Sequence, residues 1–228
     1  LLEEIQQQVD SIRFMMETYE DYEEFEQYLI ENEDHKVIGI DLCALTYNHH
    51  FDELELEELT PDQYYQVGLY YYDQRKYDEA LECFRLGEEC EDVDCLCVLG
   101  YMYEKGQGVK QNNQVAMTYY KLASDLGSVV ASCNLAYFYE YGIDVEQDYE
   151  KAYELYSLGL DEKFPRSLFS TAFFLQHGLG VEQDLEEAFY RFEEAAALGH
   201  NDAICALGEC YEFGQGVSQD YQRAFHYY

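Results

Sequence analysis

Apolar residues recur along the chain with the spacing of helices that bury one face. Leu99 and Tyr103 stand at i and i+4, and Ala152 and Tyr156 stand at the same spacing further along. Residues at this spacing line one side of an α-helix. Two such stripes, joined by a short glycine-containing segment, predict a helical hairpin. A hairpin of this kind hides its apolar faces only by stacking on further hairpins.

The hairpin pattern repeats with a period of 36 residues. Val109, Val145, Val181 and Val217 each close a segment that begins with glycine three residues earlier, and each valine follows the previous one by 36 residues. Four more columns keep this register. They are a small-residue column and three apolar columns: Gly100, Ala136, Ala172, Gly208; Tyr103, Tyr139, Leu175, Tyr211; Ala116, Ala152, Ala188, Ala224; and Tyr120, Tyr156, Phe192, Tyr228.

Turn and capping residues predict where the helices of each unit end and begin. A glycine follows the first stripe, where it accepts the positive φ that ends a helix. Asp148, Asp184 and Asp220 then precede the second stripe, where aspartate caps a helix N-terminus. Upstream, residues 60–63 combine a cap, a first-turn proline and a capping-box glutamine, which predicts another helix start.

Residues from about 94 to 228 resemble Sel1-like repeats (SLR), which are relatives of tetratricopeptide repeats. Ala131 and Leu135 match the opening of the family pattern, and Gly199 matches its inter-repeat glycine. Lys163 stands at the position where the family pattern has this glycine, so we expect a bent or loosened junction between these two repeats. The resemblance implies an all-α fold, a right-handed α-α superhelix of stacked hairpins. About function, the resemblance implies only a general class, that of scaffold or adaptor proteins.

The predicted organisation has three parts. Residues 1–59 form an acidic helical region without the repeat, either an N-terminal cap of the solenoid or a partner-binding module. Residues 60–93 form a tetratricopeptide-like repeat. Residues 94–228 form four 36-residue repeats, the last truncated, because the chain stops inside the second helix of a hairpin. We therefore expect further repeats or a capping helix to follow.

Charge narrows the choice of partner. The chain carries 48 acidic and 13 basic residues, a formal net charge of -35. Such a chain is repelled by phosphate backbones and anionic membrane surfaces, so we expect no nucleic acid and no membrane as partner. A basic protein or peptide is favoured, although the charge is equally consistent with a solubilising surface. The eight cysteines lie mostly in apolar helical stretches, which favours free thiols and a cytoplasmic location.

No catalytic or metal-binding constellation emerges from the sequence. His49 and His50 lie beside Asp52, but a second ligand pair is missing, and a solvated loop explains them better. Gly106 and Gly108 lack the strand and lysine of a phosphate-binding loop. We predict no enzyme activity, no metal and no cofactor.

The family resemblance implies that the first helix of each hairpin lines the binding surface. Counted from the small-residue column, we assign the inward positions to three residues before it and to one, four and five residues after it. The predicted partner-binding residues are Tyr65, Leu69, Tyr72, Tyr101, Glu104, Tyr137, Glu140, Tyr141, Phe173, His177, Glu209, Glu212 and Phe213. Tyrosines beside carboxylates suit lysine and arginine side chains.

Two functions follow from this surface. The favoured hypothesis is a protein-protein interaction scaffold or adaptor that binds a basic protein or peptide through an acidic, tyrosine-rich concave surface. The alternative is an acidic immunity or inhibitor protein that neutralises a basic toxin or nuclease. Each tyrosine could also serve only to pack one repeat on the next.

Overall fold

A computed structural model of the chain describes residues 61–228, and every regular element in this range is an α-helix. This confirms the predicted all-α class. The prediction for residues 1–59, a cap or a partner-binding module, lies outside the described residues. The helices are α4 (Pro61–Asp73), α5 (Tyr77–Glu89), α6 (Val93–Lys105), α7 (Asn113–Asp125), α8 (Val129–Tyr141), α9 (Tyr149–Ser157), α10 (Pro165–His177), α11 (Leu185–Ala197), α12 (Asn201–Phe213) and α13 (Tyr221–Tyr227).

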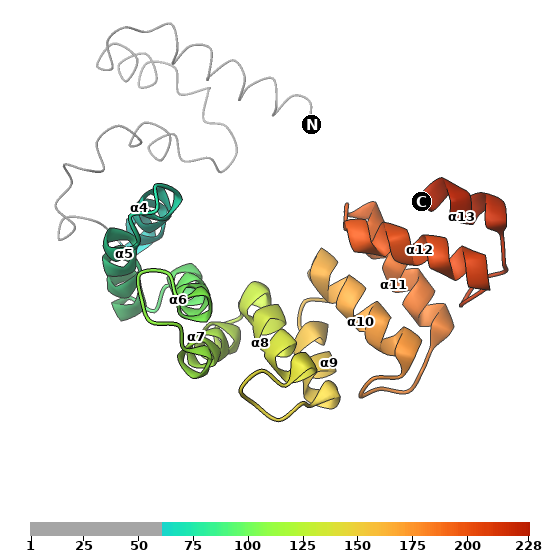
Figure 1. Ribbon diagram of the computed structural model, residues 1–228, viewed down its shortest axis with the longest axis horizontal. Coiled ribbons are helices and arrows are strands. Elements are labelled where there is room, and N and C mark those ends of the chain that lie inside the picture. Colours follow the sequence, from blue (N-terminus) through green and yellow to red (C-terminus); the bar gives the residue numbers. More distant parts are fainter. Residues whose placement is uncertain (1–60) are drawn as a thin grey trace, which may run out of the picture. The chain divides into compact units, whose positions relative to one another are not determined.

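Consecutive helices pair into hairpins that stack in chain order (Figure 1). The pairs are α4 with α5, α6 with α7, α8 with α9, α10 with α11, and α12 with α13. The second helix of each hairpin also packs on the first helix of the next hairpin. Each apolar stripe is therefore covered from both sides, as expected for a helical solenoid.

The loop inside each repeat is built from the same residues four times. The first helices α6, α8, α10 and α12 end at glycines with φ between 65 and 69°. A glutamine side chain in the following loop donates from Nε2 to a carbonyl oxygen in the last turn of that helix; these glutamines are Gln111, Gln147, Gln183 and Gln219. The loop is thus tied back to the helix that it leaves.

The second helices begin at the predicted caps. The side chains of Asp148, Asp184 and Asp220 accept hydrogen bonds from backbone N–H groups in the first turns of α9, α11 and α13, and Asn112 does the same for α7. Each cap satisfies donors that have no partner within the helix.

Small residues let the two helices of a hairpin cross closely. A Cβ atom placed on Gly100 would lie 2.8 Å from the Tyr120 ring, and one on Gly208 would lie 2.8 Å from the Tyr228 ring. The aromatic column therefore packs on the small-residue column, which explains why both keep the 36-residue register. Val145, Val181 and Val217 are partly buried against the core.

The junction after α9 is rebuilt without a glycine. Lys163 adopts a φ of 52° at the position where Gly127 and Gly199 have 98° and 86°. The helix α9 ends early, at Ser157, and turns occupy residues 158–163. Lys163 also forms an ion pair with Glu194, with Nζ and Oε1 2.9 Å apart. The helices α9 and α10 still pack against each other across this junction.

Candidate functional site

One stripe of each first helix stays open to solvent. On α8 it comprises Val130, Asn134, Tyr137 and Tyr141, spaced i, i+4, i+7 and i+11; the exposed fractions of the two tyrosines are 39% and 58%. Counted from the small-residue column, the stripe lies six and two residues before it and one and five after it. We predicted that the position three residues before the column also lies on the open surface, and this prediction is wrong for α8. There Cys133 is fully buried, with Sγ 3.3 Å from Ser167 Oγ of the next hairpin.

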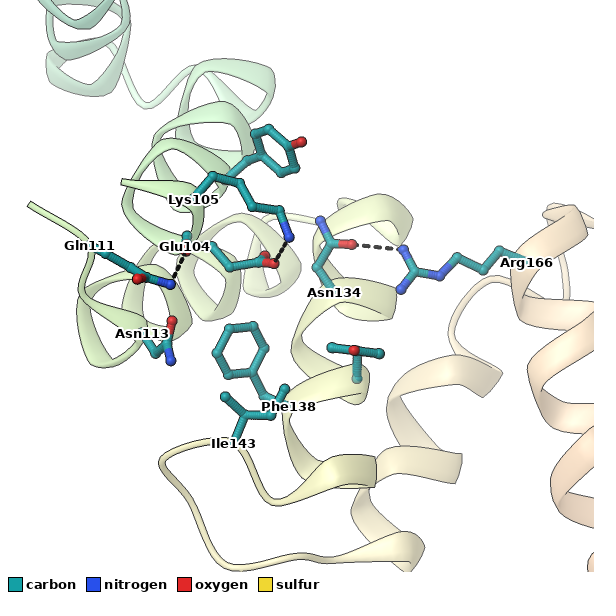
Figure 2. Close-up of a pocket in the computed structure, with 10 residues that line it drawn as sticks. Glu104, Lys105, Gln111, Asn113, Asn134, Phe138, Ile143 and Arg166 are labelled. Carbon is teal, nitrogen blue, oxygen red and sulfur yellow. Dashed lines mark hydrogen bonds and ion pairs between the residues drawn. The ribbon is translucent and has the colours of Figure 1, made fainter. Parts of the chain in front are cut away.

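The first pocket along this stripe, the α6–α8 pocket, has a volume of about 500 Å³. Figure 2 shows Glu104 and Lys105 of α6 on one side and Asn134 and Phe138 of α8 on the other. Its walls are formed by Tyr101, Glu104, Lys105, Gln111, Asn113, Asn134, Tyr137, Phe138, Ile143 and Arg166.

A second cavity, the α8–α10 pocket, follows one repeat further along and has a volume of about 380 Å³. It shares Tyr137 and Arg166 with the first, so the two pockets adjoin. It is more aromatic and contains two carboxylates. It is lined by Tyr137, Glu140, Tyr141, Tyr156, Arg166, Phe169, Ser170, Phe173, Phe174, His200 and Asp202.

Two carboxylates that line the pockets, Glu104 and Glu140, are anchored by buried tyrosines of the second helices. Tyr120 donates its hydroxyl hydrogen to Glu104 at 2.8 Å, and Tyr156 donates to Glu140 at 2.8 Å. Burial, together with the neighbouring carboxylate, raises the pKa of both phenols, which therefore stay protonated donors. Each hydrogen bond fixes the position of the carboxylate beside its pocket.

Within the α6–α8 pocket the chain supplies its own cation. Lys105 Nζ lies 2.5 Å from Glu104 Oε1 and 5.5 Å from the centre of the Tyr101 ring. The hydrogen bond to Glu104 raises the pKa of Lys105, so this side chain stays charged near neutral pH. The Glu104 charge is thus already compensated.

Arg166 stands between the two pockets. Its Nη1 donates to Asn134 Oδ1 at 2.8 Å, as Figure 2 shows, and its Nη2 donates to the Cys133 carbonyl oxygen at 3.5 Å. At the far end of the α8–α10 pocket, His200 stacks on Phe169 with ring centroids 4.6 Å apart. Burial lowers the pKa of His200, which favours the neutral imidazole at pH 7.

The two pockets bring together six of the thirteen predicted partner-binding residues. Tyr101, Glu104 and Tyr137 line the α6–α8 pocket, and Tyr137, Glu140, Tyr141 and Phe173 line the α8–α10 pocket. Seven predicted residues line neither pocket: Tyr65, Leu69, Tyr72, His177, Glu209, Glu212 and Phe213.

Among these seven residues, Tyr65, Tyr72 and Glu212 contact other side chains of the chain. Tyr65 packs near Phe84, with ring centroids 6.4 Å apart, and Tyr72 donates its hydroxyl hydrogen to Gln107 at 2.6 Å. Glu212 accepts from the Tyr228 hydroxyl at 2.7 Å. Gln176, which the column assignment places on the open surface, is 8% exposed and donates to Gln215 Oε1 at 2.6 Å, so that assignment is wrong.

Sequence reasoning missed the residues that complete the pockets on α10 and α12. Arg166 and Ser170 lie six and two residues before the small-residue column, in the same i, i+4, i+7 series as Phe173. This helical spacing was a usable signal. Asp202 and His200 come from the start of the next repeat, and they reach the pocket because α12 packs on α11, which pairs with α10.

Within the described residues we find neither a cluster of metal ligands nor a helix that could span a membrane. No three or more histidine, cysteine or carboxylate side chains among residues 61–228 are grouped to hold a metal ion. The seven cysteines in this range carry free thiols, and burial raises the pKa of Cys83 to about 12. No helix in the described part of the chain has the length and apolar character needed to cross a membrane.

Comparison with known proteins identifies the repeat. A family model described as Sel1 repeat matches residues 93–128, 129–162, 165–200 and 201–228, more than half of the chain. A crystal structure of a Sel1 repeat protein from Oxalobacter formigenes is 27% identical, with a TM-score of 0.65, over 71% of this chain and 66% of that one. No curated protein matches the sequence.

A second solved structure shows the same fold over a longer stretch. It is a protective antigen present in uropathogenic Escherichia coli strains that displays an SLR fold. It is 21% identical, with a TM-score of 0.71, over 92% of this chain and 48% of that one. The chain therefore spans about two thirds of the length of the first structure and about half of the second.

Proposed function

Because this chain belongs to the Sel1 repeat family, whose members are generally protein-interaction scaffolds, we propose that it binds a basic segment of a partner protein along the open stripe of its first helices. The observation that carries the proposal is the pair of adjoining pockets. Each is walled by tyrosines and contains a carboxylate held by a buried tyrosine hydroxyl.

The chemistry of these walls suits cationic side chains. Tyrosine is a frequent hot-spot residue at protein interfaces, and its ring face attracts lysine and arginine. The chain's own cations already use such faces. Lys151 Nζ lies 4.1 Å from the centre of the Tyr139 ring, and the Arg223 guanidinium lies 5.4 Å from that of Tyr211. The formal net charge of -35 adds long-range attraction for a basic partner.

The test compares a labelled decalysine peptide with a decaglutamine peptide. We expect decalysine to bind more tightly and to weaken as salt screens the charges. The double variant Tyr101→Ala/Tyr137→Ala should bind decalysine at least about fivefold more weakly, because it removes two exposed rings of the pockets. Tyr190→Ala is the matched control, since Tyr190 is 53% exposed on α11 and lines neither pocket. Equal affinities for the two peptides would refute the proposal.

The second hypothesis, an acidic inhibitor of a basic toxin or nuclease, predicts more than binding. It requires the partner's activity to fall in proportion to the complex formed. A partner captured through the pockets that keeps its full activity would favour the scaffold over the inhibitor.

A further inference from the structure

The positions one, four and five residues after the small-residue column form a triplet at the end of each first helix. In α6 the triplet is tyrosine, glutamate and lysine, and in α8 it is tyrosine, glutamate and tyrosine. The triplets of α10 and α12 lack the tyrosine at the first position. The members are Tyr101, Glu104, Lys105; Tyr137, Glu140, Tyr141; Phe173, Gln176, His177; and Glu209, Glu212, Phe213.

The α6 triplet shows how these side chains hold a cation. The ammonium group of Lys105 pairs with the Glu104 carboxylate at 2.5 Å and lies 5.5 Å from the centre of the Tyr101 ring. The other Glu104 oxygen accepts from Tyr120, so the carboxylate is held in place from the opposite side. An ion pair and an aromatic face thus act on one ammonium group.

In α8 the same arrangement is present without the cation. Glu140 accepts from Tyr156 as Glu104 does from Tyr120. Tyr141 takes the place of the lysine, and its ring lies beside Tyr137 with centroids 4.6 Å apart and planes inclined by 44°. Glu140 forms no ion pair with any described residue within 4.0 Å. The rings of Tyr137 and Tyr141 and the Glu140 carboxylate therefore line the place that corresponds to the ammonium site of the preceding repeat, and there the Tyr141 hydroxyl interacts with Glu140.

We propose that the α8–α10 pocket takes a lysine or arginine side chain of the partner, in the position that Lys105 fills from within the chain in the preceding repeat. This inference rests on the proposed function and assigns it a specific pocket. It also assigns the α6–α8 pocket a different role. Because Lys105 already compensates Glu104, that pocket takes an uncharged part of the same segment.

The remaining charges around the α8–α10 pocket are compatible with a cationic guest. Glu140 and Asp202 are acidic, and Arg166 is the cation among the lining residues. The Arg166 guanidinium donates to Asn134 and to the Cys133 carbonyl oxygen, two acceptors outside the lining of this pocket, which fixes its orientation. With a neutral His200, the lining keeps one net negative charge for the guest.

The decisive variant is Tyr141→Lys, which copies the α6 triplet into α8 and fills the pocket from within. His177→Lys is the matched control, because it adds one positive charge at the equivalent position of α10, beside Gln176 and Phe173. We expect Tyr141→Lys to bind labelled decalysine at least about fivefold more weakly than His177→Lys does. Equal weakening in the two variants would overturn the pocket assignment and leave the salt-dependent binding of decalysine intact.

A reciprocal pair tests the α6–α8 pocket. Lys105→Gln removes the internal cation from Glu104, whereas Lys110→Gln removes an equal charge from an exposed loop position. We expect Lys105→Gln to bind decalysine at least about twofold more tightly than Lys110→Gln does. No difference between them would contradict the role of Lys105 as an internal guest. Should Tyr141→Lys fail to fold, judged by its thermal transition, Glu140→Gln carries the same expectation, because glutamine still accepts from Tyr156.

Discussion

Within each hairpin, the aromatic-column residue of the second helix faces a residue of the first helix, and the two identities vary together from one repeat to the next. Where the aromatic column holds Tyr120 or Tyr156, the facing position holds Glu104 or Glu140. The repeat formed by α10 and α11 has Phe192 in that column and Gln176 at the facing position, and both are buried. A buried hydroxyl needs an acceptor, whereas phenylalanine needs none. The carboxylates of the candidate site therefore have a structural role as well.

Removing one of these hydroxyls should cost stability. We expect Tyr156→Phe to lower the free energy of unfolding by about 1 kcal/mol, because Glu140 loses its buried donor. Urea denaturation monitored by circular dichroism measures the change. Tyr190→Phe is the control, since Tyr190 is exposed and its hydroxyl lies 3.3 Å from Glu194; its effect should stay within about 0.5 kcal/mol. Equal stabilities for the two variants would contradict the role of the buried bond.

Between hairpins, the loop of one repeat rests on the start of the previous second helix. Gly180 has a φ of 63°, and a Cβ atom there would overlap the backbone of Tyr149 and Glu150 at the start of α9. Asp144 takes the equivalent position in the preceding repeat, with a φ of 52°. It accepts a hydrogen bond from Asn113 Nδ2 at 2.8 Å at the start of α7. Both versions join neighbouring repeats through the loop.

The variant Gly180→Ala should loosen this joint. The added methyl group meets backbone atoms that cannot turn aside, and alanine is strained at a positive φ, so we expect a loss of about 2 kcal/mol or more. Gly199→Ala separates the two causes, because Gly199 has a φ of 86° with open space around it. Differential scanning calorimetry should show the lower Tm for Gly180→Ala. A Tm equal to that of Gly199→Ala would mean that the contact with α9 contributes nothing.

At the scale of the whole molecule, charge opposes the compact state. Each hairpin is stabilised by its neighbours, and the folded stack confines the charges of the chain to a smaller volume than the unfolded chain occupies. With 48 acidic and 13 basic residues in the chain, like-charge pairs outnumber opposite pairs. A net charge of this size destabilises a folded chain through self-repulsion.

Salt should therefore stabilise the protein. Raising NaCl from about 20 mM to about 300 mM shortens the screening length from about 20 Å to about 6 Å, which weakens repulsion between exposed carboxylates. We expect the Tm to rise over this range, while binding of decalysine weakens. A falling Tm would show that attractive ion pairs dominate the electrostatics of the fold.

The sequence by itself determined the features that depend on local chemistry and on the repeat. Asp148, Asp184 and Asp220 cap their helices as predicted, because capping involves only neighbouring backbone groups. The small-residue and aromatic columns predicted the hairpins, because two helices that cross closely need one small partner. Family membership follows from the same columns.

Only the tertiary structure decided which side chains meet in the pockets. Cys133 faces Ser167 of the next hairpin, and Gln176 donates a partly buried hydrogen bond to Gln215. Both depend on the angle at which one hairpin packs on the next, and the spacing along a single helix does not contain that angle. For the same reason Asp202 reaches a pocket of the preceding repeat only once α12 has packed on α11, which pairs with α10.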